Sequence, residues 1–274
     1  MIIGNKNFDT KNNVYIMGIL NVTPDSFSDG GKYNSLDSAL FQAESMINNG
    51  ASIIDIGGES TRPGYTKISD DEEVERVLPV IEKIRANFDT TISLDTYKSG
   101  VIKQVGSKID LVNDIWGLKY DGTMADQIAK FDLACCLMHN RKEADYSDFW
   151  SDYMNDMREC IQMAKDAGID KNKIMLDGGV GFQKTYEQNL MVINRTEELC
   201  SFGYPVLIAT SKKSVIGAVT DRTVDQRTAG TIATSVIGIL KGGSFLRVHD
   251  VAENLDAIKI CKSVLEEKKW IQSK

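Results

Sequence analysis

Eight short runs rich in Val, Ile and Leu recur along the 274-residue chain, and each leads into a longer segment. Alternation of apolar runs with segments of helical period is typical of βαβ units and a parallel sheet. The runs cover residues 14–22, 52–58, 91–96, 111–115, 133–139, 174–179, 206–211 and 245–250. Each run therefore predicts a buried parallel strand.

The number of these units favours a closed barrel over an open sheet. Eight βα units in about 250 residues is the (β/α)8 count. A doubly wound sheet would use the same units, but no GxGxxG follows the first run as a dinucleotide-binding fold would require. No Pro/Gly/Ser-rich linker or low-complexity tract divides the chain. We therefore predict an α/β fold, a single (β/α)8 TIM barrel, with residues 1–274 as one domain.

Several intervening segments carry helix signals. Apolar residues at helical spacing lie between Ser35, placed to cap a helix, and Gly50, placed to end it. The "SDDE" that starts at Ser69 has the form of a capping box, and Pro79 is expected to kink or break the helix that follows. Apolar stripes over 154–164 and 251–265 predict two more helices that face the core.

Composition excludes several classes of protein. The 32 basic and 39 acidic residues give a net charge of −7 without a Lys/Arg block, so nucleic acid is not an expected partner and an anionic substrate needs local cations. The five cysteines have no metal-binding spacing and are expected to be reduced. The N-terminus has no leader pattern, and no apolar run reaches the ~20 residues that span a membrane. We expect a cytoplasmic protein with no membrane partner.

Polar side chains stand at the end of nearly every run. Active sites of (β/α)8 barrels lie at the C-terminal ends of the strands, so these side chains are candidates for an active site. Taken singly, Asp95 and Asn113 have the alternative of capping the helices that follow. The whole set is Asn21, Asp25, Asp29, Glu59, Thr61, Arg62, Asp95, Asn113, Asp114, His139, Asp177, Lys213, Ser214, Arg247 and His249.

The charges in this set indicate the kind of ligand. Arg247 and His249 are two residues apart in a strand and so point to the same side. Their partner is either Asp250 and other carboxylates or a phosphorylated ligand. Asp95 and Asp177 are suited to accept paired N–H bonds from an amidine-like or pterin-like heterocycle.

Lys213 and Ser214 stand where the seventh strand leads into a helix. Backbone N–H groups and the helix dipole favour a carboxylate or phosphate there. A Schiff-base lysine is the competing interpretation, but such a lysine usually projects from within a strand into an apolar pocket. The chain has only two histidines, no HExxH and no apparent serine triad, which disfavours hydrolysis by zinc or a triad.

Eight ordered blocks carry a family resemblance. They are "GILNVTPDSFSDGG", "DIGGESTRPG", "SLDT", "VNDI", "LMHN", "LDGGVGFQKT", "ATSKKS" and "LRVHDV", spread over residues 16 to 251. In this order they resemble the motifs of the dihydropteroate synthases. The resemblance implies condensation of 6-hydroxymethyl-7,8-dihydropterin pyrophosphate with 4-aminobenzoate in folate synthesis, a TIM barrel, a homodimer, a Mg²⁺ ion and sensitivity to sulfonamides that mimic aminobenzoate.

The resemblance also implies roles for individual residues. The implied catalytic residues are Asp95, Asp177, Lys213 and Arg247. The implied pterin site consists of Asp95, Asn113, Ile115, Met138, Asp177, Phe182, Lys213 and Arg247. The implied pyrophosphate site consists of Asn21, Arg62, Arg247 and His249, and the implied aminobenzoate site of Phe27, Thr61, Pro63, Phe182 and Ser214. Asn21 and Asp29 would hold the Mg²⁺, and the loop that ends at Gly31 would close over pyrophosphate.

The chain departs from the family pattern at two positions. Gly178 stands where the family usually has proline in "DPG", and Lys212 stands where it usually has arginine in "SRK". These departures leave open a paralogue that binds pterin without turnover. A methyltetrahydrofolate-dependent methyltransferase shares the pterin-binding barrel, but it would not need "TPDSFSDGG" or the "RVHD" cations.

Overall fold

Eight parallel strands form a closed barrel in the computed structural model, which describes residues 1–22, 32–59 and 66–267, without the side chains of residues 32–35. The strands are β3 (Tyr15–Asn21), β4 (Ile53–Gly57), β5 (Thr91–Asp95), β6 (Leu111–Asp114), β7 (Ala134–Met138), β8 (Ile174–Asp177), β9 (Val206–Ile208) and β10 (Phe245–Val248). Neighbours in the barrel follow chain order, and β10 closes the ring against β3. The predicted (β/α)8 barrel is confirmed, and the open sheet is excluded.

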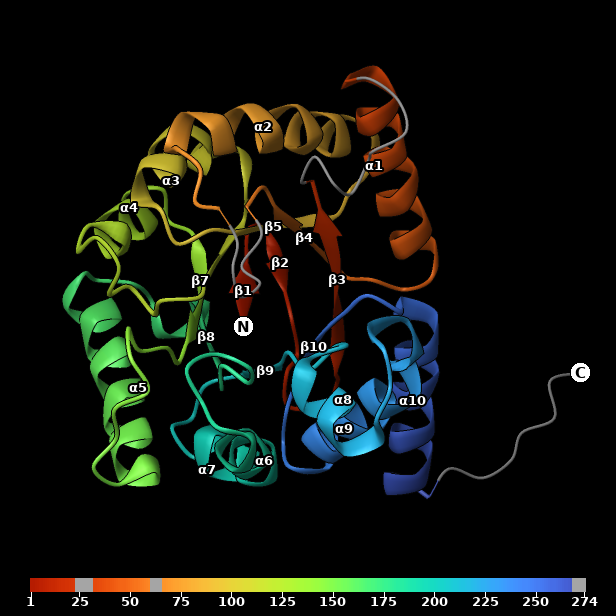
Figure 1. The fold of residues 1–274 in the computed structure, drawn as a ribbon. Coiled ribbons are helices and arrows are strands. Elements are labelled where there is room, and N and C mark those ends of the chain that lie inside the picture. The colour runs from red at the N-terminus through yellow and green to blue at the C-terminus, as the bar shows by residue number, and fades with distance from the viewer. Residues whose placement is uncertain (23–31, 60–65, 268–274) are drawn as a thin grey trace, which may run out of the picture.

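Helices surround the barrel as an outer ring (Figure 1). They are α1 (Lys32–Asn48), α2 (Asp70–Asn87), α3 (Ser99–Val105), α4 (Met124–Lys130), α5 (Phe149–Asp166), α6 (Tyr186–Asn194), α7 (Thr196–Cys200), α8 (Ser214–Thr220), α9 (Thr228–Leu240) and α10 (Val251–Leu265). Short 3-10 turns occupy Gly106–Lys108, Lys171–Lys173 and Val224–Gln226. Within the described part of the chain, the helices are too short or too polar to cross a membrane.

Helix α2 begins as predicted but does not stop at its proline. The Ser69 hydroxyl accepts a hydrogen bond from the Glu72 N–H at 3.1 Å, while the Glu72 carboxylate pairs with Arg76 at 2.6 Å. Of the kink or break expected at Pro79, the break is wrong, because the helix continues to Asn87. Pro79 and Glu75 are both exposed, so water can satisfy the Glu75 carbonyl that lacks an N–H partner.

One helix boundary and one buried position differ from the predictions. Helix α1 already begins at Lys32, so Ser35 lies inside it and does not precede it. The predicted end is confirmed: α1 stops at Asn48, and Gly50 has a φ of +100°, the left-handed conformation that glycine allows at a helix end. In α10, Leu265 is exposed, although the predicted stripe placed it against the core.

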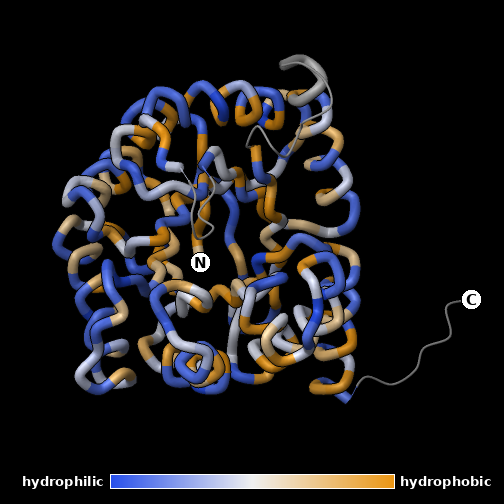
Figure 2. Tube along the Cα trace, in the orientation of Figure 1, coloured by the Kyte–Doolittle hydropathy of each residue, from blue (hydrophilic) through white to orange (hydrophobic). Residues whose placement is uncertain are grey.

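The strands divide their side chains between two cores. Residues that point outward, such as Ile54, Leu94 and Leu246, pack with the inner faces of the helices in one large cluster. Residues that point inward, such as Met17, Leu111 and Met175, form a second cluster inside the barrel. Figure 2 shows apolar residues along the central strands and mixed polarity along the outer helices. This division follows from the alternation of side chains along each strand.

The N-terminal end of the barrel is closed by a hairpin that the sequence pattern does not predict. Strands β1 (Ile2–Ile3) and β2 (Lys6–Asn7) pair antiparallel and lie across the centre of the ring in Figure 1. Ile3 and Phe8 join the inner cluster, and the Phe8 ring meets the Tyr15 ring edge-on, with centroids 4.9 Å apart. The barrel is thereby sealed at one end, and its polar side chains gather at the other.

Candidate active site

The predicted strand-end residues lie on one rim of the barrel because the strand register aligns them. Asn21 is opposite Gly57, Gly57 is opposite Asp95, and Asp95 is opposite Asn113. A Cβ atom at Gly57 would lie 3.5 Å from the Asn21 amide oxygen and 3.8 Å from the Asp95 Cβ. The Asn21 and Asp95 side chains therefore both border Gly57 at the rim.

Arg247 connects two buried carboxylates across the barrel. Its Nε donates to Asp55 Oδ2 at 2.6 Å, and its Nη2 donates to Asp95 Oδ2 at 2.5 Å. Asp55 also accepts hydrogen bonds from the Ser93 hydroxyl at 2.5 Å and the Asn113 amide at 3.0 Å. Charge pairing and hydrogen bonds thus offset part of the desolvation of these buried groups.

These contacts decide two alternatives that the sequence left open. Carboxylates are partners of Arg247, as one alternative predicted, but they are Asp55 and Asp95, whereas Asp250 pairs with Lys212 at 2.9 Å. The Asp95 and Asn113 side chains bind Arg247 and Asp55 respectively, in place of the helix caps that their positions allowed. The interior residues Asp55 and Ser93 escape a search confined to the last residues of each run. The available signal was a charged residue inside "SIIDIGG", two positions before Gly57 and therefore on the same inward face.

One oxygen of the Asp95 carboxyl has no donor in the part of the chain that the structure describes. Its Oδ1 is buried and has no hydrogen-bond partner among the described residues. Burial raises the pKa of the Asp95 carboxyl to about 7, Arg247 opposes this shift, and Asp55 adds to it. Buried polar atoms are almost always satisfied, so an unpaired carboxylate oxygen at the barrel mouth indicates a place for a ligand N–H.

Asp177 and Lys213 form a second charged group on the rim. Asp177 Oδ1 accepts the Gly179 N–H at 2.8 Å. Burial raises the pKa of Asp177, and Lys213 opposes that shift. Burial lowers the pKa of Lys213 to about 8, and Asp177 opposes that shift. Lys213 Nζ donates to the Val180 carbonyl and lies 4.9 Å from the centre of the Phe182 ring.

The position of Lys213 disfavours the Schiff-base alternative. It is the residue before α8, not part of a strand, and a main-chain carbonyl and an aromatic face hold its ammonium group. Ser214 begins α8 and is exposed.

An apolar wall lies beside the polar groups. Ile115, Met138 and Tyr97 form a small buried cluster, against which Trp116 and Phe182 pack. Three residues that the resemblance assigns to the pterin site, Ile115, Met138 and Phe182, are thus in one cluster. A flat heterocycle with polar edges would find both apolar and polar partners at this mouth.

The anion side of the site is described in part. The Ser211 hydroxyl and His249 Nδ1 are 2.9 Å apart, and the His249 N–H donates to the same hydroxyl at 3.2 Å. A hollow of about 570 Å³ borders Asn21, His249 and the first turn of α10. Phe27, Asp29, Thr61, Arg62 and Pro63 lie outside the described residues, as does the proposed loop closure over pyrophosphate.

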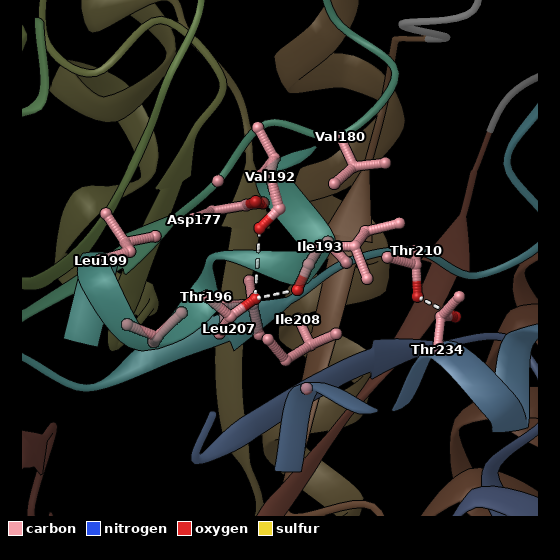
Figure 3. A pocket seen from close by; sticks show the side chains of 14 residues that line it. Asp177, Val180, Val192, Ile193, Thr196, Leu199, Leu207, Ile208, Thr210 and Thr234 are labelled. Atoms are coloured by element: carbon pink, nitrogen blue, oxygen red, sulfur yellow. Dashed lines mark hydrogen bonds between the residues drawn. The ribbon is translucent and has the colours of Figure 1, made fainter. Parts of the chain in front are cut away.

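A small cavity behind Asp177 is not the substrate site. Figure 3 shows its lining from β8, β9, α6, α7 and α9, with Thr210 bonded to Thr234 and Thr196 bonded to the carbonyls of α6. Its volume is about 20 Å³, and Val192, Leu199 and Ile208 make most of its wall apolar. That space is enough for about one water molecule.

The surroundings of Gly178 and Lys212, the two departures from the family pattern, are both described by the structure. A Cβ at Gly178 would lie 2.7 Å from Val192 Cγ1 and 3.2 Å from the Tyr153 hydroxyl oxygen. Lys212 has a left-handed φ of +56° and reaches Asp250, which also accepts from Thr228 at 2.7 Å. Lys212 therefore ties the loop before α8 to the start of α10.

Other strand-end residues have structural partners. The Asp114 carboxylate accepts the Trp116 and Leu118 N–H groups at 2.8 and 2.6 Å. Glu59 pairs with Lys98 at 2.6 Å, and His139 Nε2 lies 3.0 Å from Asp156. Among the residues the structure describes, no three His, Cys, Asp or Glu side chains are grouped to hold a metal ion.

Comparison with known proteins gives consistent results. The family model "Pterin binding enzyme" matches residues 17–249. A dihydropteroate synthase of Clostridium beijerinckii is 52% identical over 262 residues, which is 95% of this chain and 97% of that protein.

Solved structures agree over the same length. A Clostridium difficile dihydropteroate synthase, crystallised in the presence of pteroic acid, has a TM-score of 0.92 and 48% identity, covering 96% of this chain and 100% of that one. The Xanthomonas albilineans dihydropteroate synthase with 4-aminobenzoic acid has a TM-score of 0.88 and 37% identity, covering 93% and 94%.

Proposed function

Because the chain belongs to the pterin-binding enzymes and, within them, to the dihydropteroate synthases, we propose that it condenses 6-hydroxymethyl-7,8-dihydropterin pyrophosphate with 4-aminobenzoate. The products are 7,8-dihydropteroate, an intermediate of folate biosynthesis, and pyrophosphate. The observation that carries the site assignment is the buried Asp95 Oδ1, which has no donor among the described residues. A pterin N–H group would supply that donor.

We assign some side chains to the polar edges of the pterin ring and others to its faces. Asp95 and Asp177 accept N–H bonds from its edges, and Asn113, held by Asp55, adds an amide. Ile115, Met138 and Phe182 offer apolar contact. Arg247 is bound to Asp55 and Asp95 through its edge nitrogens, which leaves the guanidinium plane suited to stacking on the ring.

The proposed chemistry is a substitution at the pterin methylene carbon. The bond from this carbon to the pyrophosphate oxygen breaks, and pyrophosphate leaves with the electron pair. Positive charge that develops on the methylene and ring is stabilised by Asp95 and Asp177. The aminobenzoate nitrogen forms the new bond and then loses a proton to water. Orientation and electrostatics carry the rate, and no base with a tuned pKa is required.

We assign the pyrophosphate to the side of the mouth that carries Arg247 and His249, with Arg62 as a further cation. Asn21 offers one hard amide oxygen near Gly57, which suits a Mg²⁺ ion that takes its other ligands from water and phosphate. Asp29 is the second proposed ligand. When bound, Mg²⁺ would shield the negative charge of the leaving group.

The remaining assignments extend this proposal. Aminobenzoate would bind between Phe182, Ser214 and the residues Phe27, Thr61 and Pro63. A homodimer would use the exposed apolar side chains of α10. A cytoplasmic location stays a prediction.

Product analysis tests the proposed function. We expect dihydropteroate to form only when both substrates are present, with one pyrophosphate released per product, and we expect sulfonamides to compete with aminobenzoate. Binding of the pterin without product would favour the non-catalytic paralogue. Transfer of a methyl group from a methylated folate to a corrinoid would favour the methyltransferase.

A further inference from the structure

Lys184 lies between two loops of the barrel mouth and has no role in the chemistry described above. Its Nζ donates to the carbonyls of Gly179 at 2.9 Å, Phe182 at 3.0 Å and His139 at 3.3 Å. Burial lowers the pKa of Lys184 to about 7, and the protonated form of its amine has three N–H donors, one for each of these carbonyls. Two of the carbonyls belong to the loop after β8, and the third follows β7.

The loop after β8 contacts the side chain of Lys213, which itself precedes α8. Lys213 Nζ donates to the Val180 carbonyl and faces the Phe182 ring. A Cβ at Gly181 would lie 3.3 Å from Lys213 Cδ, so the lysine stem runs along the Gly181 backbone. Val180 and Gly181 stand between the two loop carbonyls that Lys184 binds.

A second contact restrains the same loop from α6. The Asn189 amide oxygen accepts the Gly181 N–H at 2.6 Å, and its Nδ2 donates to the Lys184 and Thr185 carbonyls. Gly179 approaches the loop after β7 closely, since a Cβ there would lie 2.0 Å from the His139 carbonyl oxygen. The loop is thus pressed against its neighbour at the point where Lys184 connects them.

We propose that Lys184 is a positioning residue for pterin binding, which fixes the loop after β8 and thereby the Lys213 ammonium. The proposal rests on the proposed function, because it takes Lys213 as a contact of the pterin. Lys184 acts through the loop and does not touch the substrate. Methionine has an unbranched side chain of similar length but no N–H donor. Lys184→Met would therefore remove the group that connects the three carbonyls.

The test is a double-mutant cycle on the dissociation constant of 6-hydroxymethyl-7,8-dihydropterin pyrophosphate, measured by titration calorimetry in the full chain. We expect Lys184→Met to raise this constant by about tenfold to a hundredfold, the cost of misplacing a charged hydrogen-bond donor. In the Lys213→Met background, the same change should raise it by about twofold or less, because residues that act through one another are not additive.

The control is Lys173→Met at the opposite end of β8. Lys173 also binds a main-chain carbonyl, that of Asp132, at 2.7 Å. The substitution Lys173→Met should leave the dissociation constant of the pterin substrate within about twofold of the wild-type value. If Lys184→Met does not fold, Lys184→Gln, which keeps one amide donor group, should give a smaller increase that is likewise lost in the Lys213→Met background.

Equal effects of Lys184→Met in both backgrounds, or no effect in the wild type, would overturn the proposal. Failure of the proposed function has a different signature. A wild-type chain that binds the pterin but forms no dihydropteroate contradicts the reaction and leaves the cycle interpretable. A wild-type chain that does not bind the pterin contradicts both proposals.

Discussion

Arg247 is held by two carboxylates inside the barrel, and only one of them stands at the rim. Its Nε binds Asp55, which is fully buried and also holds Asn113. Asp55 therefore sets the positions of two residues that we assign to the pterin. A buried charge that loses a partner is costly, because the remaining charge stays desolvated.

From this arrangement we predict that Asp55→Ala lowers the free energy of unfolding by about 3–5 kcal/mol, as expected for breaking a buried ion pair. Ser93→Ala removes one neutral donor to the same carboxylate and should cost about 1 kcal/mol. Equilibrium denaturation in urea would measure both values. Equal losses for the two variants would contradict the central role of the Asp55–Arg247 pair.

The raised pKa of Asp95 predicts how the stability of the fold depends on pH. Its pKa is raised to about 7 in the folded chain, from an unfolded value near the usual one for aspartate. Between about pH 4 and about pH 7 the folded state therefore binds more protons at this site, so its contribution to stability falls as pH rises and is lowest above about pH 7. The unfolding free energy of the wild type, minus that of Asp95→Asn, should decrease over this range. An increase would mean that Arg247 lowers the pKa below its usual value.

At the residue scale, sequence reasoning identified the rim and missed what lies below it. Asp95, Asn113, Asp177, Lys213 and Arg247 lie at or near strand ends, and the barrel geometry brings strand ends together. Asp55 and Ser93 lie inside apolar runs. A single polar residue within such a run does not by itself indicate a functional site. Only the strand register, which places both in the interior beside Arg247, gives them their partners.

At the scale of elements, tertiary packing and not local sequence determines which residue fits in the loop after β8. Gly178 stands where the sequence resemblance leads one to expect proline, and the space around it is occupied by Val192 and Tyr153. The exchange is therefore coupled to α6 and α5. Local sequence rules for glycine and proline give no information about such neighbours.

We predict that Gly178→Pro destabilises the chain by about 1–3 kcal/mol through overpacking. Adding Val192→Ala should recover part of that loss, because it removes the side chain whose Cγ1 would lie 2.7 Å from a Cβ at position 178. Thermal unfolding of the single and double variants would measure this coupling. A double variant as unstable as the sum of the two single changes would show that Val192 is not the obstacle.

The helices show the same division. The hydroxyl cap of α2 at Ser69 could be predicted because the cap is local. The continuity of α2 through Pro79 could not, since it depends on which carbonyl faces water. The β1–β2 hairpin was missed because its strands are too short for a periodic pattern, and their stability comes from the barrel end that they cover.

At the scale of the whole molecule, the barrel could be predicted from the number of βα units, whereas assembly could not be derived from any motif. Exposed apolar side chains gather on α10, where Ile260 and Val264 lie one helical turn apart and are 66% and 68% exposed. Apolar side chains left in contact with water on one helix face are typical of an interface.

We predict that the wild-type chain is a dimer and that Ile260→Glu with Val264→Glu gives a monomer, because charge would have to be buried in the interface. Tyr186→Glu is the control, since Tyr186 is 42% exposed on α6, which α9 separates from α10. Sedimentation equilibrium would give the masses. A monomeric wild type, or a dimer disrupted by Tyr186→Glu alone, would contradict this assignment.

The most direct test of the whole account is dihydropteroate formation by the wild type and by Asp95→Asn, with both substrates and Mg²⁺ present. Asp95 has a buried oxygen without a hydrogen-bond partner among residues 1–22, 32–59 and 66–267, we assign it to the pterin, and its charge would stabilise the positive charge that the departing pyrophosphate leaves on the ring. We predict turnover by the wild type and a loss of about a hundredfold or more in kcat/KM for Asp95→Asn, the scale of removing one preorganised electrostatic group. Undiminished turnover in Asp95→Asn, or pterin binding by the wild type without pyrophosphate release, would contradict it.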